Sequence, residues 1–217
     1  MSINLIQRVV SSFFLIIISF YITIKGSILF NIFLIIIFII SIKEWYKMSF
    51  NRLYFYPGVF FLILSFYTVF LMRSNDLYLF NFLILLSICI ATDIGGFLFG
   101  KLFKGPKLTK ISPNKTYSGM FGSYFTSFVV GILYIDYVSV NSIFIENKLS
   151  FLHICLLIIL ISSINQLGDL LISYFKRLRG FNDTGNMLPG HGGFLDRIDG
   201  LIFSILAGWV LINLFIL

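Results

Sequence analysis

The chain has 217 residues, of which 59% are hydrophobic and 12% are charged, and its formal net charge is +7. With a mean hydropathy of +0.99, this composition excludes an ordinary soluble domain. A basic chain can bind nucleic acid, but the bases here lie in short connections beside apolar segments, so membrane topology and anionic head groups explain them better. The two cysteines, Cys89 and Cys155, lie in apolar segments without metal-ligand spacing and are interpreted as core residues.

Seven apolar segments approach the length of a membrane span, for which about 20 residues are needed. Open strands cannot lie in lipid because their backbone polar groups would stay unpaired, so we expect helices. The sequence therefore predicts an all-α, polytopic integral membrane protein with about seven transmembrane helices and a polar cavity open to the cytoplasm. A single membrane-embedded domain would cover 1–217, with N-terminal helices over 1–85 and the polar motifs over 86–217. The segments are approximately 9–24, 28–42, 55–72, 77–100, 119–140, 151–173 and 200–217.

The distribution of the bases predicts the orientation of these spans. If the N-terminus and the connections after the even-numbered spans share one side, that side holds thirteen of the sixteen lysines and arginines. The other side holds only Lys25, Arg73 and Lys148. Because positive residues collect on the cytoplasmic side, we expect the N-terminus and the two longest polar stretches, about 101–118 and 174–199, to be cytoplasmic and the C-terminus to be outside.

Two acids lie inside apolar segments near their cytoplasmic ends. Asp93 is near the cytoplasmic end of the fourth segment, beside two glycines, where a substrate-facing role or close helix packing would each explain it. Asp169 is near the cytoplasmic end of the sixth segment, at a depth where a carboxylate is costly unless it faces protein, water or a cation. It therefore binds a metal ion or substrate, or it forms a salt bridge with Lys176 or Arg177 two turns further on.

Two polar stretches carry residues suited to phosphate chemistry. The first, SPNKTYSG from Ser112 to Gly119, places Lys115 beside several hydroxyl groups in a tight turn, although an ordinary basic loop would look the same. The second, from Ser173 to Asp199, is glycine-rich and charge-dense. Its glycines flank His191 and let successive N–H groups turn toward an anion. His191 itself could be a general base, a phosphate hydrogen-bond donor or a structural residue.

Asp196 and Asp199 are spaced so that both would face one side of a helix start. Two carboxylates so close repel each other unless a cation lies between them. Mg²⁺ accepts such oxygen ligands and usually bridges them to substrate phosphates. Capping of the helix N-terminus is the simpler alternative, and both can hold. Arg197 points elsewhere and suits bidentate phosphate binding.

Both stretches resemble the signature of the phosphatidate cytidylyltransferase family, also called CDP-diglyceride synthases. The longer pattern is a Ser followed by Lys-Arg, then Lys-Asp, Pro-x-His-Gly-Gly and Asp-Arg-x-Asp; the shorter one is Ser-Pro-x-Lys-Thr-x-Glu-Gly. Two positions depart from the family pattern, since Asn182 replaces the usual Lys and Ser118 replaces the usual Glu. The residues that match the longer pattern are Ser173, Lys176, Arg177, Asp183, Pro189, His191, Gly192, Gly193, Asp196, Arg197 and Asp199, preceded by a matching Gly168 and Asp169.

The resemblance implies an enzyme of phospholipid biosynthesis that transfers a cytidylyl group from CTP to phosphatidic acid, giving CDP-diacylglycerol and pyrophosphate at the inner (plasma) membrane. It implies Mg²⁺ held by Asp169 and Asp196, with a second cation such as K⁺ reasonable. The expected partners are CTP, phosphatidic acid and the bilayer, without nucleic acid; a homodimer is left open. The residues implied as catalytic are Asp169, Asp196, Lys176, Arg177 and His191, and those implied as substrate-binding are Ser112, Lys115, Thr116, Asp183, Gly192, Gly193, Arg197 and Asp199.

Two other functions stay open. A CTP-dependent polyprenol or lipid-alcohol kinase would need a base to deprotonate a neutral hydroxyl, whereas a phosphate monoester dianion is already a nucleophile. For the cytidylyltransferase we therefore expect His191 to bind or position a phosphate rather than act as a base. An ion-coupled transporter belongs to another class, for which intramembrane acids with glycine-broken helices are typical, but the charged residues here lie on one side rather than at the midplane.

Overall fold

The protein is described by a computed structural model over residues 18–137, 151–185, 187 and 192–216. This part of the chain is helical, and its one β-type contact is an isolated bridge between Lys107 and Thr116. The predicted all-α class is therefore confirmed. The helices are α2 (Ser27–Ser49), α3 (Phe55–Ser74), α4 (Asp76–Phe103), α5 (Tyr117–Tyr137), α7 (Phe151–Leu178) and α8 (Leu195–Ile216), and residues 18–25 are helical as well.

The helices have the length and composition of membrane spans. Six of the seven predicted segments overlap these helices, and the first, 9–24, lies mostly outside the described residues. Four helices within the described part are long and apolar enough to cross a membrane, namely Ser27–Ser49, Phe55–Ser74, Tyr78–Phe103 and Phe151–Leu178. The chain is an integral membrane protein, while the count of seven spans stays a prediction. Since α4 and α7 each have 28 residues, at about 1.5 Å per residue they are longer than the hydrocarbon core is thick, about 30 Å.

The local sequence explains where helices stop at the end of the bundle that carries the motifs. After α4, Lys104 and Gly105 adopt φ of 54° and 111°, which takes the backbone out of the helical region. After α7, Gly180 has φ of 71° and donates its N–H to the Arg177 carbonyl at 3.0 Å. A left-handed residue just past the last turn is a common way to end a helix, and glycine adopts it at least cost.

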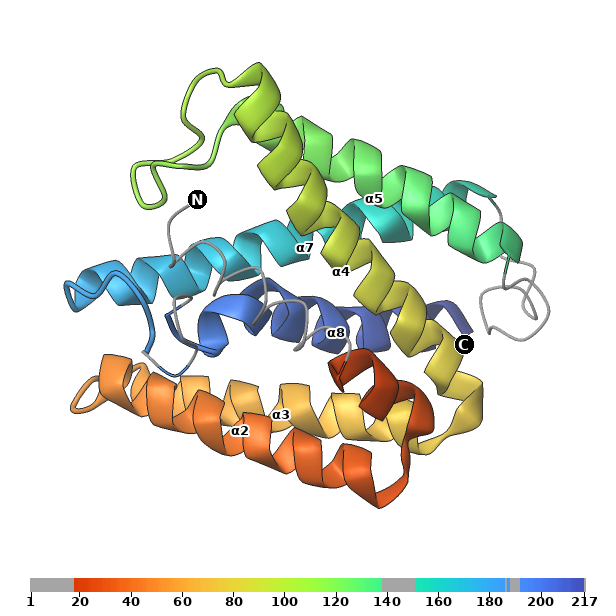
Figure 1. The fold of residues 1–217 in the computed structure, drawn as a ribbon, viewed down its shortest axis with the longest axis horizontal. Coiled ribbons are helices and arrows are strands. Elements are labelled where there is room, and N and C mark those ends of the chain that lie inside the picture. The colour runs from red at the N-terminus through yellow and green to blue at the C-terminus, as the bar shows by residue number, and fades with distance from the viewer. Residues whose placement is uncertain (1–17, 138–150, 186, 188–191, 217) are drawn as a thin grey trace.

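The last two helices lie at the centre of the bundle. In Figure 1, α7 and α8 run side by side through the middle, with α2 and α3 on one side, α5 on the other, and α4 crossing obliquely. One buried core joins α3, α4, α7 and α8 around residues such as Leu85 and Leu157, and a second joins α2, α3, α7 and α8 around Trp45 and Leu195. Because α7 and α8 contribute to both cores, the whole bundle fixes their positions.

Helices α4 and α5 approach each other through glycines. A Cβ atom at Gly95 would lie 2.5 Å from the carbonyl oxygen of Gly122, and one at Gly119 would lie 2.7 Å from that of Gly96. Side chains at these positions would therefore force the two backbones apart, as in other membrane helix pairs built on small residues. Close helix packing accounts for the glycines beside Asp93.

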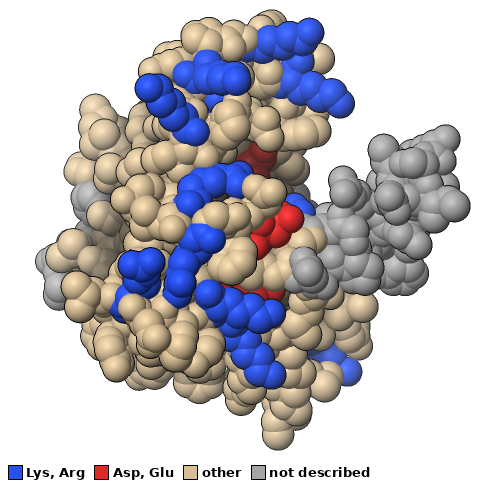
Figure 2. Space-filling view, turned by 90° about the vertical axis from the view of Figure 1, so that its left-hand side faces the viewer, with Lys and Arg blue, Asp and Glu red and all other residues tan. Residues whose placement is uncertain are grey.

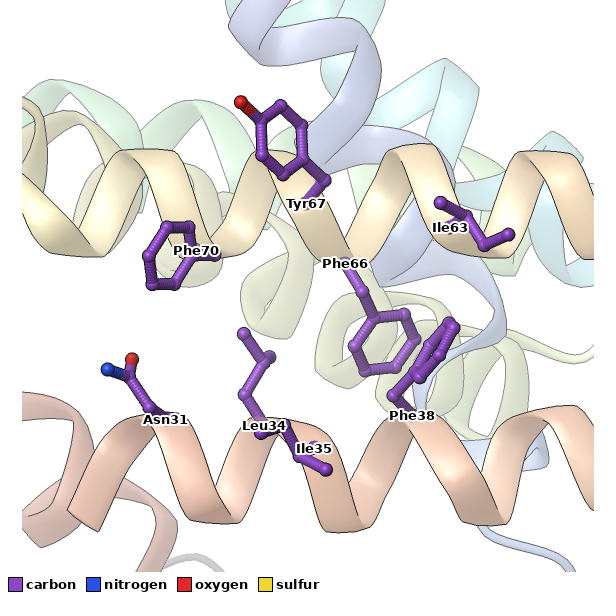
Figure 3. Close-up of a pocket in the computed structure, with 8 residues that line it drawn as sticks. All are labelled: Asn31, Leu34, Ile35, Phe38, Ile63, Phe66, Tyr67 and Phe70. Atoms are coloured by element: carbon purple, nitrogen blue, oxygen red, sulfur yellow. The ribbon is translucent and has the colours of Figure 1, made fainter. Parts of the chain in front are cut away.

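An apolar pocket of about 430 Å³ lies between α2 and α3. Its lining contains no charged residue, and Asn31 and Tyr67 are its polar members (Figure 3). A site for an anionic nucleotide needs positive charge, so this pocket is not one. Its lining residues are Asn31, Leu34, Ile35, Phe38, Ile63, Phe66, Tyr67 and Phe70.

Candidate active site

Three connections bring the charged residues to one end of the bundle. The α2–α3, α4–α5 and α7–α8 connections all lie on the left in Figure 1. Figure 2 looks onto that end and shows lysines and arginines gathered over it, with carboxylates visible between them. The two motif stretches, which are separate in the sequence, therefore face the same region.

The first ion pair joins the two stretches. The Lys115 ammonium lies 2.5 Å from Oδ2 of Asp169, and their side chains are 25% and 33% exposed. Lys115 also donates to the backbone carbonyl of Gln166 at 3.5 Å. Asp169 thus forms a salt bridge, but the alternative that paired it with Lys176 or Arg177 is wrong, because its partner is Lys115. Ser173, also part of the motif, donates its hydroxyl to Oδ1 of Asp169 at 3.3 Å.

The second ion pair is more deeply buried and joins α7 to α8. Nζ of Lys176 lies 2.5 Å from Oδ1 of Asp196, with side chains 10% and 9% exposed. The other oxygen of Asp196 accepts the backbone N–H of Thr184 at 2.8 Å and its hydroxyl at 3.1 Å. Both oxygens of this carboxylate therefore have hydrogen-bond donors within the protein.

Asp199 lies one turn after Asp196 and is only 9% exposed. Its carboxylate accepts the backbone N–H of Gly200 at 2.9 Å and lies within the electrostatic reach of Asp169, Asp196 and Lys176. The predicted clustering of Asp196 and Asp199 at the helix start is thus present, with Asp169 close enough to add its charge. Among the described residues, however, no three acidic, histidine or cysteine side chains lie close enough together to hold a metal ion on their own.

Asp93 is an exposed residue of α4. Its Oδ1 accepts a hydrogen bond from the Asn165 amide at 2.7 Å, which links α4 to α7. Asp93 also lies within the electrostatic reach of Asp169 and Lys115. The polar groups of the site thus continue from the ion pairs into the bundle along the facing sides of α4 and α7.

Hydrogen bonds inside the Ser112–Gly119 stretch shape the turn that holds Lys115. The hydroxyl of Thr116 accepts the N–H of Gly119 at 3.1 Å and so caps the N-terminus of α5. The carbonyl of Lys115 accepts the N–H of Leu108 at 2.7 Å. Ser118, which stands in the place of the family's Glu, donates to the backbone carbonyl of Lys104. This residue therefore contacts the loop and not the ion pairs.

The Ser112 backbone N–H belongs to the same turn, because it donates to the Thr109 hydroxyl at 3.2 Å. The carbonyl of Ser112 in turn accepts the N–H of Lys115 at 3.1 Å.

The α7–α8 connection is held at both ends. Arg177 donates to the carbonyl of Phe181 at 3.2 Å and to the side chain of Asn182, the residue that replaces the family's Lys. Asp183 is exposed, and a Cβ atom at Gly192 would lie 3.0 Å from its carboxyl carbon. Gly193 is also tightly enclosed, since a Cβ atom there would lie 1.8 Å from the hydroxyl oxygen of Thr184.

Arg197 and His191 complete the set of predicted site residues. Arg197 lies at the exposed surface of the first turn of α8. His191 and Pro189 lie outside the described residues, so the prediction for His191 stays open.

The sequence reasoning missed Glu44 of α2. This acid is 4% exposed, and its carboxylate accepts the N–H groups of Phe194 and Leu195 at 2.9 and 2.7 Å and the Thr184 hydroxyl at 2.8 Å. It therefore caps α8 from a helix far away in the chain. The available signal was its isolation, because Glu44 is the only acid among the first 75 residues. A second missed residue, Arg179, donates to the Met48 carbonyl at 3.1 Å and ties α7 to the end of α2.

These features define a helical integral membrane protein whose paired lysines and carboxylates meet at one end of the bundle, a type of site suited to phosphate compounds. Comparison with known families identifies the class more closely: the model of the cytidylyltransferase family matches residues 51–215 of this chain. The chain belongs to the cytidylyltransferase family.

Individual relatives agree with this assignment. A phosphatidate cytidylyltransferase of Rickettsia bellii is 37% identical over 182 residues, which cover 81% of this chain and 77% of the relative. The protein of that name from Rickettsia conorii is 33% identical over 187 residues, covering 82% and 78%. One from Staphylococcus epidermidis is 41% identical over 115 residues, covering 52% and 42%.

Proposed function

We propose that this protein transfers the cytidylyl group of CTP to phosphatidic acid, forming CDP-diacylglycerol and pyrophosphate. The observation that carries the proposal is the meeting of two lysine–carboxylate pairs, Lys115 with Asp169 and Lys176 with Asp196, at one end of a membrane bundle. One substrate is a lipid anchored by its chains, and the other is a soluble, strongly anionic nucleotide. A charged site where apolar helices end serves both.

The reaction needs positioning and charge stabilisation more than acid–base chemistry. An oxygen of the lipid phosphate attacks the α-phosphorus of CTP in line, a new P–O bond forms, and the bond from the α-phosphorus to the bridging oxygen of pyrophosphate breaks. The lipid phosphate is already an anion, so no residue has to remove a proton. Lys115 and Lys176 would leave their carboxylates to bind phosphate oxygens, and the leaving pyrophosphate would be stabilised by Lys176, Arg177 and Arg197.

We also propose that Mg²⁺ takes part, held by Asp169 and Asp196. Both carboxylates already face a positive group at 2.5 Å, and Asp199 adds further negative charge nearby. Because Mg²⁺ usually takes one or two carboxylates together with substrate phosphates and waters, these residues fit an ion that arrives with the nucleotide. When bound, it would neutralise charge that develops at the α-phosphate of the transferred cytidylyl group. A second cation, such as K⁺, belongs to the same proposal.

The orientation that we propose places the charged end in the cytoplasm of a bacterial inner membrane. The support is the positive-inside rule, together with the gathering of bases on that end of the described structure (Figure 2). CTP is made in the cytoplasm, and a nucleotide of that charge does not cross a bilayer unaided. The homodimer remains an expectation, which the mass of the detergent-solubilised protein by light scattering would decide.

The deciding experiment is a substrate-dependence assay on purified protein in detergent. We expect CTP to be consumed only when phosphatidic acid is added, with release of pyrophosphate and formation of CDP-diacylglycerol. A lipid-alcohol kinase would instead release CDP when given a polyprenol or diacylglycerol, and a transporter would not consume CTP at all. CDP release without pyrophosphate, or no CTP turnover with phosphatidic acid and Mg²⁺ present, would contradict the proposal.

A further inference from the structure

We propose that Glu44 is a positioning residue for the cytidylyltransferase reaction. It fixes the position of Asp196, although Glu44 itself lies in α2, outside the region that the family model matches. The inference rests on the proposed function and extends it to a part of the chain, before residue 51, that the family model does not cover. Glu44 does not touch the reacting groups in this scheme. It acts through Thr184 and through the first residues of α8.

Glu44 is connected to Asp196 by two routes. The first runs through the backbone: Glu44 accepts the N–H of Leu195 at 2.7 Å, and Leu195 immediately precedes Asp196. The second runs through a side chain: the Thr184 hydroxyl lies 2.8 Å from Glu44 and 3.1 Å from Asp196. Since the hydroxyl has one proton for two carboxylates, Thr184 couples the positions of both. Glu44 therefore helps to fix the position of both the backbone and the carboxylate of Asp196.

The Glu44 carboxylate is tightly packed against the α7–α8 connection. A Cβ atom at Gly185 would lie 2.5 Å from Oε1 of Glu44, and one at Gly193 would lie 2.9 Å from Oε2. The Glu44 carboxylate is therefore enclosed by the glycines of the α7–α8 connection as well as by its donors. A side chain packed in this way has few alternative positions, which is what a support for a functional group requires.

The part of α2 that carries Glu44 is itself packed into the core. Its neighbours Trp45 and Met48 are 3% and 0% exposed in the core that α2 shares with α3, α7 and α8. Arg179, the residue after α7, donates to the Met48 carbonyl at 3.1 Å at the end of α2. Leu195, the first residue of α8, belongs to the same core, so α2 serves as a fixed reference for the site.

The test compares Glu44→Gln and Thr184→Val with two controls. Gln keeps the size of Glu but replaces one acceptor oxygen by an NH₂ group. This group would face the N–H or hydroxyl donors that now bind the carboxylate. Val keeps the shape of Thr without its hydroxyl. Leu62→Ala weakens the same core without touching these bonds. Ser41→Ala removes a buried hydroxyl of α2 whose hydrogen bond, 2.8 Å long, stays within its own helix.

We expect kcat of Glu44→Gln and Thr184→Val to fall by about 10- to 100-fold, the usual effect of removing a group that orients a ligand. The KM for CTP should change much less, because the substrate contacts remain. The double variant should lose little more than the more severe single variant, since both substitutions break the same connection. Hydrogen–deuterium exchange should quicken at Phe194 and Leu195 in Glu44→Gln without changing in α4 and α5.

The controls decide between positioning and stability. Leu62→Ala should melt at a lower temperature but keep the kcat of its folded fraction, and Ser41→Ala should resemble wild type. The proposal is overturned if kcat of Glu44→Gln stays within about twofold of wild type. It is also overturned if Leu62→Ala loses as much kcat, or if the losses of the two single variants multiply.

Two further outcomes keep the inference separate from the function on which it rests. If Glu44→Gln does not fold, Thr184→Val decides alone and must lose kcat. A wild-type protein that does not convert CTP and phosphatidic acid would defeat the proposed function, while the exchange measurement would still show whether Glu44 orders the start of α8.

Discussion

Removing the charge of Asp196 should cost this protein both stability and activity, for separable reasons. Asp196→Asn leaves the Lys176 ammonium, 10% exposed, without the carboxylate that lies 2.5 Å from it. It also turns an amide donor toward either this ammonium or the Thr184 N–H. Breaking a buried ion pair by removing one partner typically costs about 3–5 kcal/mol. For a chain of this size, each loss of about 1 kcal/mol in unfolding free energy lowers the melting temperature by about 2–4 °C. A loss of about 3 kcal/mol, the lower end of that range, should therefore lower the melting temperature by about 6–12 °C.

A second substitution separates the two effects. In the double variant Asp196→Asn/Lys176→Met the unpaired charge is gone, and replacing a buried pair by uncharged groups of similar volume is often neutral for stability. The melting temperature should therefore recover much of its loss, whereas activity should not, because both groups assigned to phosphate and metal binding are missing. Lys47→Gln removes an exposed charge of α2 and serves as the control; it should change stability by less than about 0.5 kcal/mol.

The assay combines melting of the detergent-solubilised protein, followed by tryptophan fluorescence, with pyrophosphate release from CTP and phosphatidic acid. If Asp196→Asn melts like the wild type, the ion pair does not hold α7 to α8 as its geometry indicates. If its activity stays within about tenfold of wild type, a barrier change of only ~1.4 kcal/mol, the metal and phosphate role of Asp196 is wrong.

Three other outcomes are expected. Asp169→Asn should raise the Mg²⁺ concentration needed for half-maximal activity, and a lower melting temperature with unchanged Mg²⁺ dependence would instead make it a structural partner only. Gly119→Ala should lower the melting temperature, since its Cβ would lie 2.7 Å from the carbonyl oxygen of Gly96; unchanged melting would show that α4 and α5 can separate at no cost. In a background without the native cysteines, a cysteine at Lys110 should be protected from an external, membrane-impermeant thiol reagent and one at Ser74 should be labelled, and the reverse pattern would refute the proposed orientation.

The helices were predictable because their cause is local. A run of apolar residues with a turn signal at its end has few alternatives in a bilayer, where a backbone must satisfy its own hydrogen bonds. For this reason α3 and α7 overlap the expected segments 55–72 and 151–173 closely. The meeting of the two motif stretches at one end of the bundle was predictable too, because it follows from the alternation of spans and short connections.

The pairing of charges within the site was not predictable. Helical spacing favoured Lys176 or Arg177 as the partner of Asp169, since they lie two turns along the same helix. The structure places Lys115 there and gives Lys176 to Asp196. These pairings depend on the path of the α4–α5 and α7–α8 connections, and helical periodicity cannot predict the path of a connection.

Glu44 shows a different limit of sequence reasoning. Its partners at Phe194 and Leu195 are backbone N–H groups, and every residue except proline has one, so no residue type marks the contact. Glu44 and Leu195 are 151 residues apart, and nothing in either local sequence relates them. The isolation of one acid in a long apolar region was the only sign that a buried group needed it.

The arrangement of the charges suggests why an enzyme of this kind would carry its lysines and carboxylates in pairs. A buried carboxylate or ammonium is costly alone, because water no longer stabilises its charge. Asp169 with Lys115, and Asp196 with Lys176, are each neutral together, so the substrate-free site avoids this cost. In the proposed mechanism, a nucleotide that arrives with its own cation would offer both members of a pair a new partner, since phosphate suits lysine and the cation suits aspartate. The pairs can then open without leaving a charge uncompensated, which requires that one member of each stays fixed. In the proposed mechanism the contacts of Glu44 and Thr184 would hold Asp196 in that way, and the flexible Lys176 side chain would be the member that moves to a phosphate.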